Sequence, residues 1–215
     1  MISINLKKRI YTASILFFLV FLIFNSKIIL TYFLIVFGIL SIIEFLQITI
    51  KIFKTKISLI LFNIFFSTYV FYFCLFFLFS YETQLKFVIL TLLIGCVASD
   101  IGGYVFGKIF KGPRLTKISP NKTYAGFFGS LFLSLITISS LFFYFINVFN
   151  YKIVITALTT SVFCQAGDLI FSFLKRKAKI KDSGKILPGH GGILDRLDGI
   201  FIGTPAGFLT LLIIS

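Results

Sequence analysis

Charged residues are scarce in this chain, and their scarcity excludes an ordinary soluble domain. Asp, Glu, Lys and Arg make up 13% of its 215 residues, hydrophobic residues make up 58%, and the mean hydropathy is +1.05. Such values are typical of integral membrane proteins. The apolar runs are continuous and longer than the ~10-residue alternating segments of a membrane β-barrel. The sequence therefore predicts an all-α, polytopic integral membrane protein.

Cysteine is rare as well. The three cysteines, Cys74, Cys96 and Cys164, lie inside apolar runs and lack the spacing of metal ligands. We interpret them as small buried hydrophobic residues, which argues against disulfides and against a thiolate metal site.

Glycine and proline are nearly missing from the first part of the chain. Only one of the 16 glycines, Gly38, precedes residue 95, and all four prolines follow residue 112. We therefore expect residues 1–90 to form supporting membrane helices. Residues 91–215 are expected to form a catalytic membrane domain with cytoplasmic loops at 108–122 and 175–194.

Seven apolar runs predict about seven membrane-spanning helices, since about 20 apolar residues cross a bilayer as a helix. The expected spans are residues 10–24, 28–43, 57–79, 87–107, 124–146, 153–174 and 194–215. The first two are short, and the second is expected to end near Glu44. All of the 21 Lys and Arg residues then lie on one side except Lys27, Lys86 and Lys152. By the positive-inside rule this side, which includes the N-terminus, is the cytoplasmic side of the cell (inner) membrane.

Small residues recur every four positions in three of the expected spans. This spacing places them on one face of each helix, which is how membrane helices pack closely against one another. The three stripes are Gly95, Ser99, Gly103 and Gly107; Gly126, Ser130 and Ser134; and Gly199, Gly203 and Gly207.

Acidic residues are the rarest charged type: the chain has only seven. Asp100 and Asp168 lie inside apolar runs, eight residues before Lys108 and seven before Lys175. At ~1.5 Å per residue, both are roughly 10–12 Å below the cytoplasmic ends of their helices. An ionised carboxylate in lipid costs at least about 2.5–3.5 kcal/mol. We therefore predict a shared polar cavity open to the cytoplasm; the alternative is an acid paired with a lysine or a backbone group.

Polar residues also form a line on the expected span at 153–174. Gln165, Asp168, Ser172 and Lys175 follow spacings of three or four residues and share one helix face. The line ends at the Lys175–Arg176 pair, at the membrane surface. It predicts a polar path from the lipid headgroups to the cavity, with snorkelling lysine and tolerated polar residues as the alternative.

Asp195 and Asp198 begin the last expected span and also share a face. We expect one of them to join Asp168 around Mg²⁺, which prefers one or two carboxylates together with substrate phosphate oxygens. A second cation is left open, and capping of the helix N-terminus is the alternative.

A glycine-rich segment, Pro188-Gly189-His190-Gly191-Gly192, precedes these aspartates. Successive backbone N–H groups there could bind an anion, and His190 could act as an acid or base. The alternatives are a plain turn and a histidine that only hydrogen-bonds.

Together these segments resemble the phosphatidate cytidylyltransferase (CDP-diacylglycerol synthase) family. The long signature is matched by Ser172, Lys175-Arg176, Lys181-Asp182, Pro188, His190-Gly191-Gly192, Asp195-Arg196 and Asp198. A second block is matched by Asp100, Tyr104, Gly107 and residues 118–123. The chain departs from the family pattern at Gly103, at Asn121 and at Tyr124-Ala125, where Trp-Glu is usual.

The resemblance implies that CTP and phosphatidate form CDP-diacylglycerol and pyrophosphate at a cytoplasm-facing membrane cavity, with Mg²⁺ and as a homodimer. It implies catalytic roles for Asp168, Asp195, Asp198, Lys175 and Arg176, and metal ligands among Asp168, Asp195, Asp198 and Asp100. It implies substrate contacts from Ser119, Lys122, Ser172, Lys181, Asp182, His190, Gly191, Gly192 and Arg196.

Rival functions are a CTP-dependent lipid-alcohol kinase and a transporter. A CDP-alcohol phosphatidyltransferase is disfavoured because its D-G-x-x-A-R motif is absent. Nucleic acid is not an expected partner, since the basic residues are divided among short loops.

Overall fold

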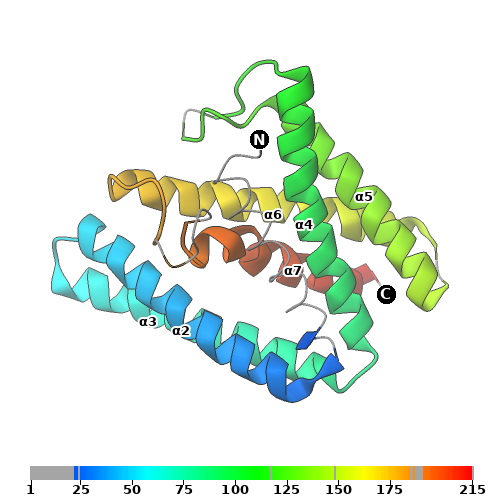
Figure 1. Ribbon diagram of the computed structural model, residues 1–215, viewed down its shortest axis with the longest axis horizontal. Helices are drawn as coiled ribbons and strands as arrows, with labels where there is room; N and C mark the ends of the chain where they lie inside the picture. Colours follow the sequence, from blue (N-terminus) through cyan, green and yellow to red (C-terminus); the bar gives the residue numbers. More distant parts are fainter. Residues whose placement is uncertain are drawn as a thin grey trace, which may run out of the picture. The chain divides into compact units, whose positions relative to one another are not determined.

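The computed structural model describes residues 22–23, 25–116, 118–147, 149–184, 186 and 191–214. Within them it contains six long helices, labelled as in Figure 1: α2 (Lys27–Ile52), α3 (Lys56–Tyr81), α4 (Leu85–Phe110), α5 (Tyr124–Ile146), α6 (Tyr151–Lys177) and α7 (Leu194–Ile214). The described residues form no strand beyond one isolated bridge between Arg114 and Thr123. The all-α prediction is confirmed.

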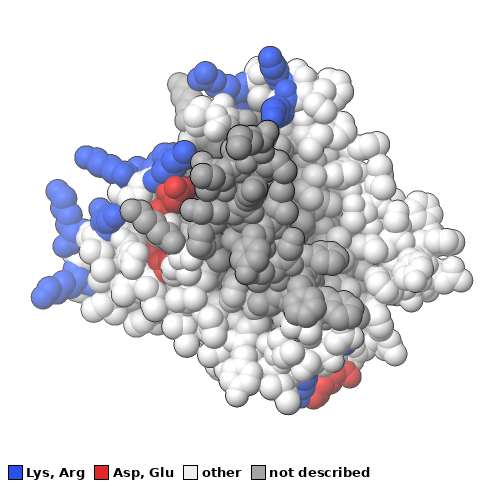
Figure 2. Space-filling model, viewed as in Figure 1, with Lys and Arg blue, Asp and Glu red and all other residues white. Residues whose placement is uncertain are grey.

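All six helices are long and apolar enough to cross a membrane, so the chain is a multi-pass membrane protein. Large hydrophobic side chains such as Phe65, Tyr144 and Ile213 are exposed on the helix surfaces, where lipid can cover them. Figure 2 shows that acidic and basic side chains gather in a few groups on the face viewed and leave wide areas with neither. Of the first expected span (10–24), the structure describes residues 22 and 23 alone, so the prediction of that span lies outside the described residues.

The chain divides into two compact units, each described here by itself. Unit 1 combines residues 1–82 with 174–196, and unit 2 combines residues 83–173 with 197–215. The functional boundary expected near residue 90 stays a prediction.

In unit 1, α2 and α3 lie side by side as a hairpin (Figure 1). The rings of Phe45 and Phe66 stack with centroids 3.9 Å apart, and an ion pair between Lys27 and Glu82 joins the start of α2 to the end of α3. The expectation that the second span ends near Glu44 is wrong. The helix continues to Ile52 because Glu44 is buried with hydrogen-bond partners and does not mark the membrane surface.

In unit 2, α4 and α5 approach each other through small residues, as predicted. A Cβ on Gly102 would lie 2.4 Å from the Gly129 carbonyl oxygen, and one on Gly103 would lie 2.7 Å from Ser130 Oγ. The stripe on α7 packs in the same way, with Gly203 against Cys164 of α6. The glycine and serine spacing therefore marks real helix contacts.

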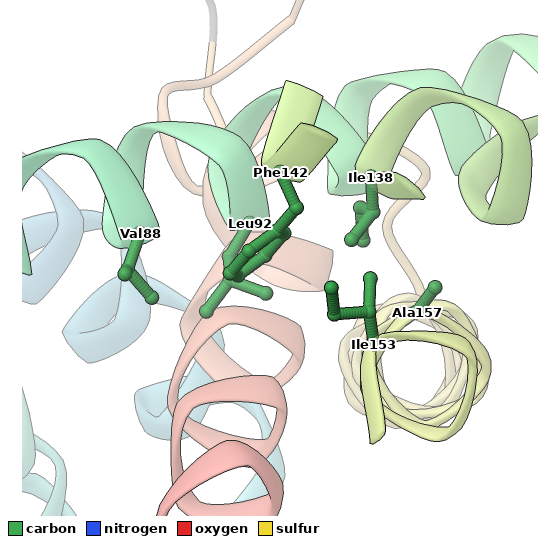
Figure 3. Close-up of a cluster of buried hydrophobic side chains, with 6 residues drawn as sticks. All are labelled: Val88, Leu92, Ile138, Phe142, Ile153 and Ala157. Atoms are coloured by element: carbon green, nitrogen blue, oxygen red, sulfur yellow. The ribbon is translucent and has the colours of Figure 1, made fainter. Parts of the chain in front are cut away.

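A compact apolar cluster completes unit 2 (Figure 3). It brings side chains from α4, α5 and α6 together: Val88, Leu92, Ile138, Phe142, Ile153 and Ala157. This cluster is assembled from helices that also carry the aspartates Asp100 and Asp168, and it fixes their helices relative to one another.

Candidate active site

The loop between α4 and α5 delivers a lysine to α6 within unit 2. The Nζ of Lys122 forms an ion pair with the Asp168 carboxylate, and the two side chains are 24% and 31% exposed. Two segments more than 40 positions apart, both singled out in the sequence, therefore meet. The sequence left two interpretations of Asp168 open, a shared polar cavity or pairing with a lysine or backbone group, and the ion pair with Lys122 is a pairing of the second kind.

The loop that carries Lys122 has a defined backbone. Leu115 N donates to Lys122 O at 2.7 Å, and Lys122 N donates to Ser119 O at 3.1 Å. Thr123 then caps α5, its Oγ1 accepting from Gly126 N at 3.1 Å, as Thr does at helix N-termini. Because cap and turn are adjacent, the position of Lys122 is tied to the start of α5, and Ser119 lies in the same turn.

Asp198 lies close to the backbone of α6. A Cβ on Gly167, the residue before Asp168, would lie 2.5 Å from Asp198 O, so α6 and α7 cross in contact at this point. Asp198 is 6% exposed, and its Oδ1 accepts from Gly199 N at 2.9 Å. The crossing places the backbone of Asp198 beside the residue before Asp168, and a metal held by the two carboxylates stays a prediction.

Asp100 of α4 contacts α6 on the helix face that carries Asp168. Its Oδ1 is 3.8 Å from Cys164 Sγ, and Cys164 is one helical turn before Asp168. Behind them, Ser99 and Ser161 hydroxyls join α4 to α6 at 2.8 Å, and Gln165 Nε2 donates to Ser161 Oγ at 3.5 Å. Polar groups therefore follow the α4–α6 contact. Of the predicted polar path, Gln165 takes part in these contacts, and the path itself stays a prediction.

In unit 1, Asp195 has a crowded carboxylate. Lys175 Nζ donates to its Oδ1 at 2.6 Å, while Ser183 N and Gly192 N donate to its Oδ2 at 2.8 and 3.0 Å. The Lys175 and Asp195 side chains are each only 11% exposed. Asp195 thus joins the end of α6, the following loop and the start of α7.

Glycine is required beside this carboxylate. Gly191 has φ +83°, a conformation that L side chains rarely adopt, and a Cβ there would lie 2.9 Å from Asp195 Oδ2. The N–H of Gly192 is directed to Asp195. The predicted anion-binding segment also includes residues 188–190, with His190, and these lie outside the described residues.

Sequence reasoning missed Glu44. This residue of α2 is 1% exposed and accepts hydrogen bonds from Ser183 Oγ at 2.7 Å, Ile193 N at 3.1 Å and Leu194 N at 2.9 Å. The available signal was an acidic residue with apolar neighbours in a chain that has only seven acids. Its position was taken as the end of a span, so its partners were not sought.

The remaining predicted residues are more open. Arg176 is exposed, and its Nη1 donates to Ile180 O at 3.2 Å. Lys181, Asp182 and Arg196 are exposed and Ser172 is half-buried. In neither unit do three described His, Cys, Asp or Glu side chains form a group that could by itself hold a metal ion.

The chain matches the model of the cytidylyltransferase family over residues 4–214. The chain belongs to this family. The predicted resemblance is therefore confirmed. The segments on which it was based lie on α4, α6 and α7 and in the loops that follow α4 and α6.

Curated proteins similar to this chain agree with the family assignment. A phosphatidate cytidylyltransferase of Staphylococcus aureus (strain COL) is 43% identical over 144 residues, covering 65% of this chain and 54% of the relative. One of Staphylococcus haemolyticus (strain JCSC1435) is 44% identical over 119 residues, covering 54% of this chain and 45% of the relative. The chain spans about half the length of the curated relatives it matches.

The aspartates of this chain have the donor chemistry of a Mg²⁺ site. The backbone carbonyl of Asp198 contacts α6 at Gly167, the residue before Asp168, and the Asp168 carboxylate already pairs with a cation, the ammonium of Lys122. Two carboxylates completed by phosphate oxygens suit Mg²⁺, so these residues fit. Asp195 fits less well because its carboxylate already accepts three hydrogen bonds.

Proposed function

We propose that this chain is a phosphatidate cytidylyltransferase that converts CTP and phosphatidate to CDP-diacylglycerol and pyrophosphate. The observation that carries the proposal is the Lys122–Asp168 ion pair. It joins the loop block at 118–123 to Asp168 of α6, four residues before the first matched residue of the long signature, Ser172. The names of the relatives, about half of whose length this chain matches, support the same activity.

In the proposed reaction a phosphatidate oxygen attacks the α-phosphorus of CTP. A new P–O bond forms, the bond to the β-phosphate breaks, and pyrophosphate leaves. The nucleophile is already an anion, so catalysis depends on positioning and on neutralising charge. Bound Mg²⁺ would supply part of that neutralisation.

The chain's own residues would supply the rest. Asp168 and Asp198 would hold the metal, with Asp100 nearby. Lys122 would leave Asp168 when a cation binds and turn to a phosphate, a move that its flexible stem permits. Lys175, Arg176 and Arg196 would hold phosphates, with Asp195 orienting Lys175.

We propose that the chain lies in the cell (inner) membrane. The loops at 111–123 and 178–193 would then face the cytoplasm. The distribution of Lys and Arg supports this orientation, since only Lys27, Lys86 and Lys152 fall on the opposite side. We also propose a homodimer by resemblance. Mass measurement of the detergent-solubilised protein by light scattering would test it, and a monomer mass would overturn it.

The deciding assay uses the purified full chain in mixed micelles with CTP, phosphatidate and Mg²⁺. Pyrophosphate and a lipid-soluble cytidine product should appear together and in equal amounts. CDP together with a phosphorylated lipid alcohol, when such an alcohol is supplied, would instead show a kinase. Phosphatidate movement between leaflets without turnover would indicate a transporter.

A further inference from the structure

Glu44 is a buried acidic residue inside the membrane helix α2, and it has no role in the proposed reaction. Placing a carboxylate at such a position is costly unless it is hydrogen-bonded. Here its three described partners are Ser183, in the loop after α6, and Ile193 and Leu194, at the start of α7. The carboxylate therefore fastens that loop and the start of α7 to α2 within unit 1.

Two of the three donors belong to the beginning of α7. Ile193 N and Leu194 N precede the first complete turn and have no carbonyl partner within the helix. A carboxylate at this end is stabilised both by these N–H groups and by the helix dipole. Glu44 thus acts as an N-terminal cap supplied by a different helix.

The same region holds Asp195. Ser183 donates its hydroxyl to Glu44 at 2.7 Å and its backbone N–H to Asp195 at 2.8 Å. Gly192 donates its N–H to Asp195, and a Cβ on Gly192 would lie 2.4 Å from Glu44 Oε2. Both carboxylates therefore contact the loop at Ser183 and the residues at the start of α7.

We propose that Glu44 is a positioning residue that acts on Lys175 through Ser183 and residues 192–194. By fixing Ser183 and the start of α7, it directs two backbone N–H groups at Asp195, and Asp195 in turn holds the Lys175 ammonium. The effect of Glu44 on phosphate binding by Lys175 rests on the proposed function. The hydrogen bonds by which Glu44 holds Ser183 and the start of α7 do not depend on that function.

The principal test is Glu44→Gln, with Glu82→Gln as matched control. Both remove one negative charge from unit 1, but Glu82 is 63% exposed and pairs with Lys27 at the far end of the α2–α3 hairpin. An amide at position 44 places an NH₂ group against backbone N–H donors. Hydrogen–deuterium exchange of the full-length protein in nanodiscs should then quicken at residues 192–194 by about tenfold or more, the scale of losing a hydrogen bond to a charged group. The control should leave it unchanged.

Kinetics supply the second readout. Glu44→Gln should lower kcat about tenfold while the KM for CTP changes less, and Glu44→Asp, which keeps the charge, should recover part of the loss. A purely structural role would lower the amount of folded enzyme without this graded recovery. Equal exchange at 192–194 in wild type and Glu44→Gln would overturn the proposal.

Two further outcomes of these experiments also bear on the proposal. If Glu44→Gln does not give monodisperse protein, Ser183→Ala replaces it, since this change removes one donor and leaves the carboxylate; unaltered exchange at 192–194 would then overturn the proposal. If the wild type does not transfer cytidylyl groups, the proposed function fails, and the exchange result still decides whether Glu44 holds the start of α7.

Discussion

In unit 2 the Asp168 carboxylate meets one described cation, the long side chain of Lys122, and is 31% exposed. In unit 1 the Asp195 carboxylate accepts three hydrogen bonds, two of them from backbone N–H groups, and is 11% exposed. A flexible, partly solvated ion pair contributes little to stability and is easily exchanged for another partner. A buried pair with backbone donors is costly to break.

The difference separates two roles among aspartates that look alike in sequence. Asp168 can exchange its lysine for a metal or a substrate group without disturbing the backbone. Asp195 cannot be released without freeing the loop between α6 and α7. We therefore expect mutations of Asp195 to affect folding, and mutations of Asp168 to affect chemistry.

The largest effect is expected for Asp195→Asn. The change removes the carboxylate charge that faces the buried Lys175 ammonium, and breaking a buried pair in this way costs about 3–5 kcal/mol. The thermal unfolding midpoint of the protein in detergent should fall sharply, and activity should fall with it. Lys181→Gln, an exposed charge change in the same loop, is the control for stability. An unchanged midpoint in Asp195→Asn would remove the distinction drawn between the two aspartates.

Asp168→Asn should act in the opposite way. Loss of a charge that organises the reacting phosphates should lower kcat by about 100-fold or more, while the exposed ion pair is worth about 1 kcal/mol or less to stability. Paired measurements of kcat and of the unfolding midpoint check both parts. A midpoint that falls as far as that of Asp195→Asn would mean that Asp168 is also a structural residue.

Sequence patterns predicted the helices because apolar runs and four-residue glycine spacings are local signals. The α5 bounds were predicted correctly, and the packing of Gly103 and Gly203 followed from the stripes. The end of α2 was not predicted, because hydropathy treats Glu44 as a surface residue and takes no account of partners about 140 positions away. Long-range hydrogen bonds leave no periodic trace in a single sequence.

The candidate site was predicted in the same uneven way. Asp168 and Asp198 were identified from their charge and setting and Lys122 from the family resemblance, and the structure pairs Lys122 with Asp168. The crowding of Asp195 could not be foreseen, since two of its donors are backbone groups that any residue possesses. Side-chain chemistry can be inferred from sequence, whereas backbone donors become visible only in the fold.

Helix packing offers a third, smaller contrast between the units. A Cβ on Gly102 of α4 would lie 2.4 Å from a backbone carbonyl oxygen, which cannot move aside, whereas a Cβ on Gly38 of α2 would lie 3.4 Å from Val70 Cγ1, an ordinary contact. Gly102→Ala should therefore cost about 1–3 kcal/mol through overpacking.

Gly38→Ala is the matched control, since it makes the same change inside another helix. It should leave the unfolding midpoint unchanged or raise it, because alanine is favoured over glycine in a helix by about 1 kcal/mol. Equal midpoints for the two variants would contradict the close α4–α5 contact. A lower midpoint for Gly102→Ala alone would show that unit 2 depends on backbone proximity where unit 1 does not. That would explain why glycine is confined so largely to the part of the chain after residue 95.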